Sequence, residues 1–91
     1  MIQKEITITN PSGLNVEPAQ ILSGRARQYE CKITMYYRHY NINVKSMIHI
    51  LSAAIVCGTK LTLECDGQDE QQCMDDLCKL LAHDLEQEKP Q

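Results

Sequence analysis

Residues 31–44 read CKITMYYRHYNINV, and this stretch decides the fold class. Apolar side chains occupy every second position in both halves of it: Cys31, Ile33, Met35 and Tyr37, then Tyr40, Ile42 and Val44. A period of two is typical of strands that bury one face and leave the other in water. The two halves therefore predict a β-hairpin, even though the linking residues Arg38 and His39 are not the glycine or asparagine that two-residue turns favour.

Two further segments, residues 2–9 and 61–65, alternate in the same way and end at the turn-forming sequences Asn10-Pro11-Ser12-Gly13 and Asp66-Gly67. Helical spacing fills the gaps between the strands. The first predicted helix covers residues 16–28 with Asn15 as its N-cap, the second is short and follows Ser46, with Gly58 as its stop, and the third closes the chain. The apolar faces of the three helices are, in chain order, Ala19, Leu22 and Ala26; Ile48, Leu51 and Ile55; and Cys73, Leu77, Leu80 and Leu81.

The element order is thus βαββαβα. Four strands that are each polar on one face imply an antiparallel sheet with helices on the other face, an α+β open-faced two-layer sandwich. The face predicted to be wet carries Thr7, Thr9, Lys32, Thr34, Asn41, Asn43, Thr62 and Glu64.

With 91 residues and 43% hydrophobic residues, the chain is expected to build one core, in a single domain over residues 1–86 followed by a polar tail over 87–91. The length excludes the large barrel and doubly wound enzyme scaffolds, and we predict a protein that is not an enzyme. No apolar run reaches the roughly 20 residues that a membrane helix needs, and the first residues lack a signal-peptide pattern. A cytoplasmic protein without membrane contact is expected.

Charge is unevenly distributed. Residues 1–60 carry three acids and seven bases, whereas residues 61–91 carry nine acids and two bases. The acidic C-terminal third makes nucleic acid an improbable partner. Arg25, Arg27 and Lys45 either form a local patch that docks a partner or are scattered solubilising charges, and the sequence leaves both readings open.

The five cysteines contain no Cys-x-x-Cys pair, so neither a disulfide framework nor a zinc ribbon is indicated, and no metal or cofactor is predicted. Cys31 and Cys65 lie on the apolar phase of strands and Cys73 on that of a helix, which favours reduced, buried thiols that act as small hydrophobic residues. The roles of the other two, Cys57 and Cys78, stay open. The three histidines, His39, His49 and His83, are scattered.

These residues together resemble the HPr family, the histidine-containing phosphocarriers of the bacterial phosphoenolpyruvate-dependent sugar phosphotransferase system. The resemblance spans nearly the whole chain and rests on Thr9-Asn10-Pro11-Ser12-Gly13-Leu14, Pro18-Ala19, Asn43-Val44-Lys45-Ser46 and Gly67-x-Asp69-Glu70. It implies the HPr fold, with sheet order 1-4-2-3 and three helices on one face.

The family's phosphorylation motif, Gly-Leu-His-Ala-Arg-Pro-Ala, departs here to Gly-Leu-Asn-Val-Glu-Pro-Ala over residues 13–19. The resemblance places Asn15 where the family has its phosphoacceptor His, and Glu17 where it has the Arg that steadies the phosphoryl group. An amide nitrogen has no free lone pair for the transfer. A helix N-terminus favours an anion by about 0.3–1 kcal/mol, whereas a carboxylate about 4 Å away opposes it by roughly 4 kcal/mol per charge at an effective dielectric of 20. Loss of phosphocarrier activity is therefore expected.

Ser46 is the second position that the resemblance makes important. In relatives from Gram-positive bacteria the matching serine is phosphorylated by HPr kinase, and the product binds a catabolite-control transcription regulator. The simpler interpretation is that Ser46 only caps the helix that follows it, and the two can both hold. Met47, Ile48 and Ile50 resemble the exposed apolar patch through which the family docks its partners.

The sequence therefore predicts a regulatory or interaction protein in carbon catabolite control. Its expected partners are HPr kinase, a catabolite-control regulator or phosphotransferase-system proteins, and its partner-binding residues are Asn15, Glu17, Arg25, Arg27, Lys45, Met47, Ile48 and Ile50. Two alternatives remain. The chain is an active phosphocarrier that uses another residue, such as His49, or it is a protein-binding module unrelated to sugar transport.

Overall fold

The computed structural model describes residues 1–84, with side chains to residue 82. The predicted polar tail over 87–91 and the end of the predicted domain lie outside the described residues. No helix among the described residues is long and apolar enough to cross a membrane.

Four antiparallel strands form one sheet in the order β1-β4-β2-β3, as the resemblance predicted. They are β1 (Ile2–Thr7), β2 (Lys32–Tyr37), β3 (Tyr40–Asn43) and β4 (Lys60–Asp66). The predicted hairpin is confirmed, since Tyr37 pairs with Tyr40 across the two-residue turn. Arg38 takes a left-handed conformation with φ 57°. The turn thus forms although it lacks the glycine or asparagine that such backbone geometry favours.

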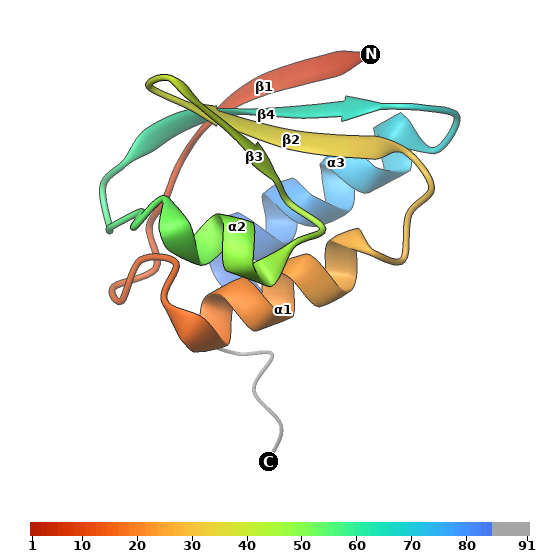
Figure 1. Cartoon of the computed structure of the whole chain (residues 1–91). Helices are drawn as coiled ribbons and strands as arrows, with labels where there is room; N and C mark the ends of the chain where they lie inside the picture. Colours follow the sequence, from red (N-terminus) through yellow and green to blue (C-terminus); the bar gives the residue numbers. More distant parts are fainter. Residues whose placement is uncertain (85–91) are drawn as a thin grey trace.

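Three helices, α1 (Val16–Ala26), α2 (Met47–Ser52) and α3 (Glu70–Lys79), cover one face of the sheet, and the other face is open (Figure 1). A π-helical turn, η1 (Leu80–Asp84), extends α3. The βαββαβα sandwich predicted from periodicity is confirmed. The first helix ends at Ala26, two residues before the predicted boundary at residue 28.

The core lies between the sheet and the helices, where the alternating strand positions meet the helix stripes. Its fully buried side chains include Ile33, Met35, Ile42 and Leu63 from the sheet and Leu22, Ile50, Leu77 and Leu80 from the helix layer. Burying each large aliphatic side chain stabilises the fold by about 1.5–3 kcal/mol as an upper estimate. Cys31, Cys65 and Cys73 are buried as predicted, and burial raises the pKa of Cys31 to about 11.

Two positions on the face predicted to be wet are in fact buried. Thr34 is 7% exposed and Glu64 is 8% exposed. The register aligns Gln3, Glu64 and Thr34 in one row across three adjacent strands. Gln3 Nε2 donates to Glu64 Oε1 at 2.6 Å, and the Tyr36 hydroxyl donates to Glu64 Oε2 at 3.1 Å. The neighbouring long side chains thus cover the centre of the open face, which strand periodicity alone does not reveal.

The apolar stripe predicted for the second helix is wrong. Helix α2 ends at Ser52, so Ile55 lies beyond it and helical spacing does not apply there. Ile48 is 71% exposed, whereas Ile50 is completely buried. The helix is terminated by Ala53 and Ala54, the latter with φ 52°, and not by the predicted Gly58.

Candidate functional site

The loop before α1 is held against the loop after α2 by the backbone itself. Gly13 has φ +66°, and a Cβ at that position would lie 2.5 Å from the Ile55 carbonyl oxygen. Leu14 N–H donates to the same oxygen at 2.9 Å. The buried Asn10 side chain closes the turn, since its Nδ2 donates to Ser12 Oγ at 2.9 Å and to the Gly13 carbonyl at 2.7 Å. Only a glycine accommodates both the left-handed backbone and the close approach.

Asn15 stands at the start of α1, in the N-cap position that was predicted, but its side chain makes no capping hydrogen bond. The capping role assigned to the amide is therefore wrong, although its backbone carbonyl accepts from Ala19 N–H at 2.9 Å. The exposed side chain instead helps line a cavity of about 310 Å³. Ser12, Leu14, Asn15, Val16, Leu51, Ala54, Ile55 and Val56 form its walls.

The surface around this cavity is unusually apolar. Val16 is 61% exposed and Val56 is 63% exposed, and both line the cavity. Ile48 lies one helical turn before the cavity residue Leu51, so the two are neighbours on the same side of α2. We call the group Val16, Ile48, Leu51 and Val56 the apolar rim. Exposed apolar residues gathered in this way mark protein-binding surfaces more often than single scattered ones do.

Ser46 is the N-cap of α2, as predicted. Its Oγ accepts from His49 N–H at 3.2 Å, and its backbone carbonyl accepts from Ile50 N–H at 3.1 Å. The side chain is half-buried. Ser46 thus has a structural role that is independent of any modification.

The structure brings two of the three predicted basic docking residues together. Arg27 Nη1 lies 3.4 Å from the Lys45 carbonyl oxygen, and Lys45 Nζ donates to the Tyr29 carbonyl at 2.6 Å. Arg25 is directed to α3, where Nη1 forms an ion pair with Asp76 Oδ1 at 2.7 Å. The hydrogen bond to Asp76 also raises the pKa of Tyr29 to about 12. Arg27 therefore contacts the chain directly before Ser46, whereas Arg25 joins α1 to α3.

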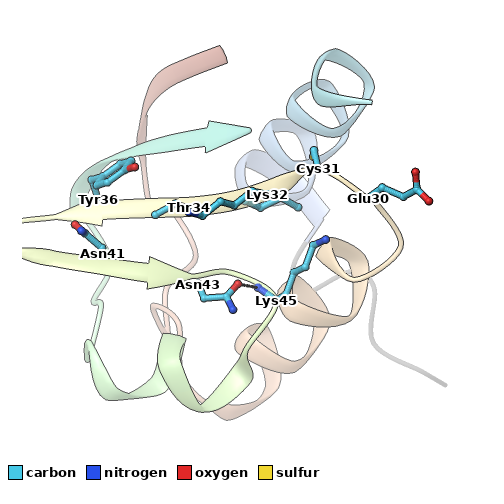
Figure 2. A pocket seen from close by; sticks show the side chains of 9 residues that line it. Glu30, Cys31, Lys32, Thr34, Tyr36, Asn41, Asn43 and Lys45 are labelled. Atoms are coloured by element: carbon cyan, nitrogen blue, oxygen red, sulfur yellow. Dashed lines mark hydrogen bonds between the residues drawn. The ribbon is translucent and has the colours of Figure 1, made fainter. Parts of the chain in front are cut away.

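Lys45 also borders a second hollow, of about 460 Å³, on the open side of the sheet (Figure 2). Seven of its nine lining residues are polar, and they come from β2, β3 and the residues beside them, including Lys32, Thr34 and Asn41. Asn43 Oδ1 accepts from Lys45 N–H at 3.1 Å, which fixes the chain as it leaves β3. This hollow shares no lining residue with the cavity at Asn15.

Two of the predicted site residues do not reach the candidate site. Ile50 was assigned to the exposed docking patch, yet it is fully buried because it lies on the side of α2 that faces the core. His49, the alternative phosphoacceptor, does not line the cavity at Asn15. Its Nδ1 accepts from Asn43 N–H at 2.9 Å, which holds the imidazole at the β3 end of α2. Met47 is half-buried and Glu17 is exposed in the first turn of α1.

Val56 is a site residue that the sequence analysis missed. It falls between the second helix and the last strand, where no periodicity assigns a face. Its position next to Ile55, whose carbonyl holds the loop before α1, brings it to the cavity. The sequence analysis also did not predict that Cys31, Cys65 and Cys73 converge in the core. They are the sole group of three or more candidate metal ligands in residues 1–82, and none of them lines the cavity at Asn15.

The fold and site define a small α+β protein with an open, mostly apolar cavity at the start of α1 and exposed apolar residues around it. Solved structures share this architecture. HPr-C-His from Thermoanaerobacter tengcongensis has a TM-score of 0.90 at 26% identity, and the match covers 98% of this chain and 100% of that one. The catabolite repression protein Crh of Bacillus subtilis has a TM-score of 0.71 at 25% identity, with 100% of both chains covered.

Sequence comparison identifies the family. A family model described as "PTS HPr component phosphorylation site" matches residues 2–83. Phosphocarrier protein HPr of Buchnera aphidicola is 30% identical over 82 residues, which is 90% of this chain and 96% of the relative. Phosphocarrier protein HPr of Cupriavidus necator is 32% identical over 83 residues, which is 91% and 93% of the two chains. The chain belongs to the HPr family of the phosphotransferase system.

Proposed function

We propose that this HPr-family protein regulates partner proteins by binding them and does not carry phosphoryl groups. The observation that carries the proposal is the residue at the start of α1. By resemblance, Asn15 occupies the position of the phosphoacceptor His, and an amide cannot accept the phosphoryl group. Among residues 1–82, whose side chains the structure describes, Ser12 and Asn15 are the polar residues that line this cavity, and neither carries an imidazole.

The charge beside Asn15 supports the same proposal. Glu17 lies in the first turn of α1, where the resemblance places the Arg that steadies the phosphoryl group. A carboxylate at a helix N-terminus complements the helix dipole, so it stabilises the helix. The same carboxylate repels a phosphoryl donor that approaches the helix start. Both residues thus disfavour phosphorylation, and Glu17 also stabilises the start of α1.

The surface around Asn15 is suited to binding proteins. The apolar rim surrounds a cavity whose walls are mostly apolar, and Ser46 with its neighbours Arg27 and Lys45 lies at the other end of α2. Crh, whose name assigns it to catabolite repression, is among the structural relatives. We infer that the partners are those of carbon catabolite control: HPr kinase, a catabolite-control regulator or proteins of the phosphotransferase system.

The first prediction concerns phosphoryl transfer. Incubation with enzyme I and phosphoenolpyruvate is expected to leave the protein without an acid-labile phosphohistidine, as measured by mass spectrometry. The double substitution Asn15→His with Glu17→Arg should restore transfer, because it supplies an imidazole and removes the repelling carboxylate. Asn15→His alone should restore less. A heat-labile phosphate on the unaltered chain would contradict the proposal and favour the alternative of an active phosphocarrier.

The second prediction concerns Ser46. Treatment with HPr kinase and ATP should place one phosphate on this residue and none on the Ser46→Ala variant. The phosphate adds about −1.5 to −2 charges beside Arg27 and Lys45. It should therefore change the affinity for a catabolite-control regulator, measured by calorimetry, while the far-ultraviolet circular dichroism stays the same. Complete phosphorylation with unchanged regulator binding would exclude Ser46 as a switch, and no phosphorylation would leave it as a helix cap.

A further inference from the structure

Three thiols that the proposed function does not use meet inside the core. Cys31 immediately precedes β2, Cys65 lies in β4 and Cys73 in α3. They are 2%, 0% and 0% exposed. Their sulfur atoms all lie within 4.8 Å of one another, and Cys65 Sγ donates to Cys73 Sγ at 3.6 Å. We call this group the thiol triangle.

The backbone around the thiol triangle is held in place by close contacts. Asp69 accepts two backbone N–H bonds, from Glu30 at 2.9 Å and from Cys31 at 3.0 Å, and so fixes the chain that carries the first sulfur. Gly67 packs so tightly on this chain that a Cβ there would lie 2.7 Å from the Cα of Cys31. The three sulfurs are therefore brought together by the packing of β4, α3 and the chain before β2.

The distances fit three sulfur ligands around one atom. Ligands about 2.3 Å from a shared centre lie roughly 3.5–4.0 Å from each other, depending on whether the arrangement is pyramidal or planar. Cys65 and Cys73 already have this separation, at 3.6 Å. The remaining pairs, at no more than 4.8 Å, need a contraction of about an ångström or less. In residues 1–82 no carboxylate or imidazole joins the group as a fourth ligand, and zinc usually requires four.

Burial decides which ion suits the site. A net charge inside the core costs several kcal/mol. A complex of three thiolates with a monovalent ion has a net charge of −2, and one with a divalent ion has a net charge of −1. A complex with a trivalent ion is neutral. We propose that Cys31, Cys65 and Cys73 form a binding site for a trivalent thiophilic ion of the arsenite class.

The reaction balances without a redox step. Arsenous acid, As(OH)₃, condenses with three thiols, so that three As–S bonds replace three As–O bonds. Each thiol proton leaves with one hydroxide as water, three waters in all. Neither arsenic nor sulfur changes its oxidation state, and no net charge is left in the core. The product would join β4, α3 and the chain before β2 at one point.

The test is a titration of the reduced protein with sodium arsenite under anaerobic conditions. Intact-mass measurement should show one arsenic gained and three hydrogens lost, with a higher unfolding temperature. The variants Cys31→Ala and Cys73→Ala should lose this adduct, with apparent affinity falling at least tenfold. Cys57→Ser and Cys78→Ser are matched controls that should keep it, because neither residue belongs to the thiol triangle. Far-ultraviolet circular dichroism checks the fold of each variant.

Two outcomes would overturn the proposal. One is an adduct that survives Cys73→Ala and Cys31→Ala, or disappears with Cys57→Ser. The other is a larger rise in unfolding temperature with Cu(I) or Zn(II) than with arsenite, since that would contradict the argument from charge. If Cys73→Ala does not fold, Cys31→Ala decides, because Cys31 lies outside the regular elements. Phosphoryl transfer and Ser46 phosphorylation are not involved in either result.

Discussion

At the scale of single residues, Gly13 determines how the candidate site is built. Its backbone is left-handed, and the Ile55 carbonyl oxygen occupies the space that a side chain would need. The left-handed conformation costs a non-glycine residue roughly 1–2 kcal/mol even in open space. The sequence could predict a turn from Asn10-Pro11-Ser12-Gly13, but the contact with Ile55 depends on a residue about forty positions away and has no sequence signature.

Substituting this glycine should therefore unfold the loop and weaken the site. Gly13→Ala is expected to lower the free energy of unfolding by more than about 2 kcal/mol, because strain and steric overlap add. Gly24→Ala is the matched control: it lies inside α1 with nothing within 4 Å of the added methyl group, so it should raise stability by about 0.5–1 kcal/mol. Urea unfolding of both variants measures the difference. Equal effects would show that the close approach at Ile55 is unimportant.

At the scale of elements, α1 and α2 begin with good capping residues but only one of them caps. Ser46 Oγ accepts the bond from His49 N–H, while the Asn15 amide makes no such bond. The sequence could predict both cap positions from residue type. It could not predict the bonds, because these depend on the side-chain rotamer.

This difference should appear in stability. Ser46→Ala is expected to cost about 1 kcal/mol in the free energy of unfolding. Asn15→Ala should lower the free energy of unfolding by only a few tenths of about 1 kcal/mol, since no side-chain hydrogen bond is lost. Thermal or urea unfolding of the two single variants gives the comparison. A loss at Asn15 as large as that at Ser46 would mean that the amide caps α1 in solution.

The errors in the sequence analysis also belong to this scale. Strand alternation placed four strands correctly, since a period of two defines a face even over the four to seven residues of these strands. Helix α2 has six residues, fewer than two turns, and in so short a segment several apolar stripes fit equally well. The prediction thus placed the exposed Ile48 on the core-facing stripe as well as in the docking patch, and it placed the buried Ile50 in the docking patch.

At the scale of the whole molecule, Glu70 ties the end of the sheet to α3 and to the start of the chain. Its Oε1 accepts from Gly67 N–H at 3.0 Å, and the carboxylate contacts the Met1 ammonium at 2.8 Å. The bond from Gly67 holds the pKa of the Glu70 carboxyl below its usual 4.5. A carboxyl whose pKa is lower in the folded state stabilises the fold at all pH values above the unfolded pKa. That contribution is lost as the pH falls through the folded value.

Glu70→Gln should therefore make stability less dependent on pH. The amide oxygen can still accept from Gly67, but the charge is gone, so the variant is expected to be less stable than the parent at neutral pH. The gap should begin to narrow as the pH falls below the usual carboxyl pKa of 4.5, and it should close as the pH passes through the lower pKa of the folded state. Urea midpoints across this range are the measurement, with Glu5→Gln, an exposed carboxylate of β1, as control. A gap that stays constant with pH would contradict the assigned role of the charge.

The topology was predictable at this scale, whereas the convergence of residues distant in sequence was not. Element order and family motifs led to the sheet order 1-4-2-3. The thiol triangle joins positions 31, 65 and 73, whose spacing matches no metal or redox motif. The strand or helix periodicity around each cysteine predicted that it is buried. That the three sulfur atoms lie close together depends on how β4, α3 and the chain before β2 pack, which periodicity does not reveal.

The bond from Leu14 N–H to the Ile55 carbonyl, and the close approach of Gly13 beside it, tie together the two loops that form the walls of the cavity at Asn15. A partner that inserts an apolar side chain there does not have to order a loop first, so little conformational entropy is lost on association. Complex formation should then show a negative heat-capacity change with small structural rearrangement. The cavity would then be a pre-organised binding surface, and shape complementarity would determine which partners bind tightly.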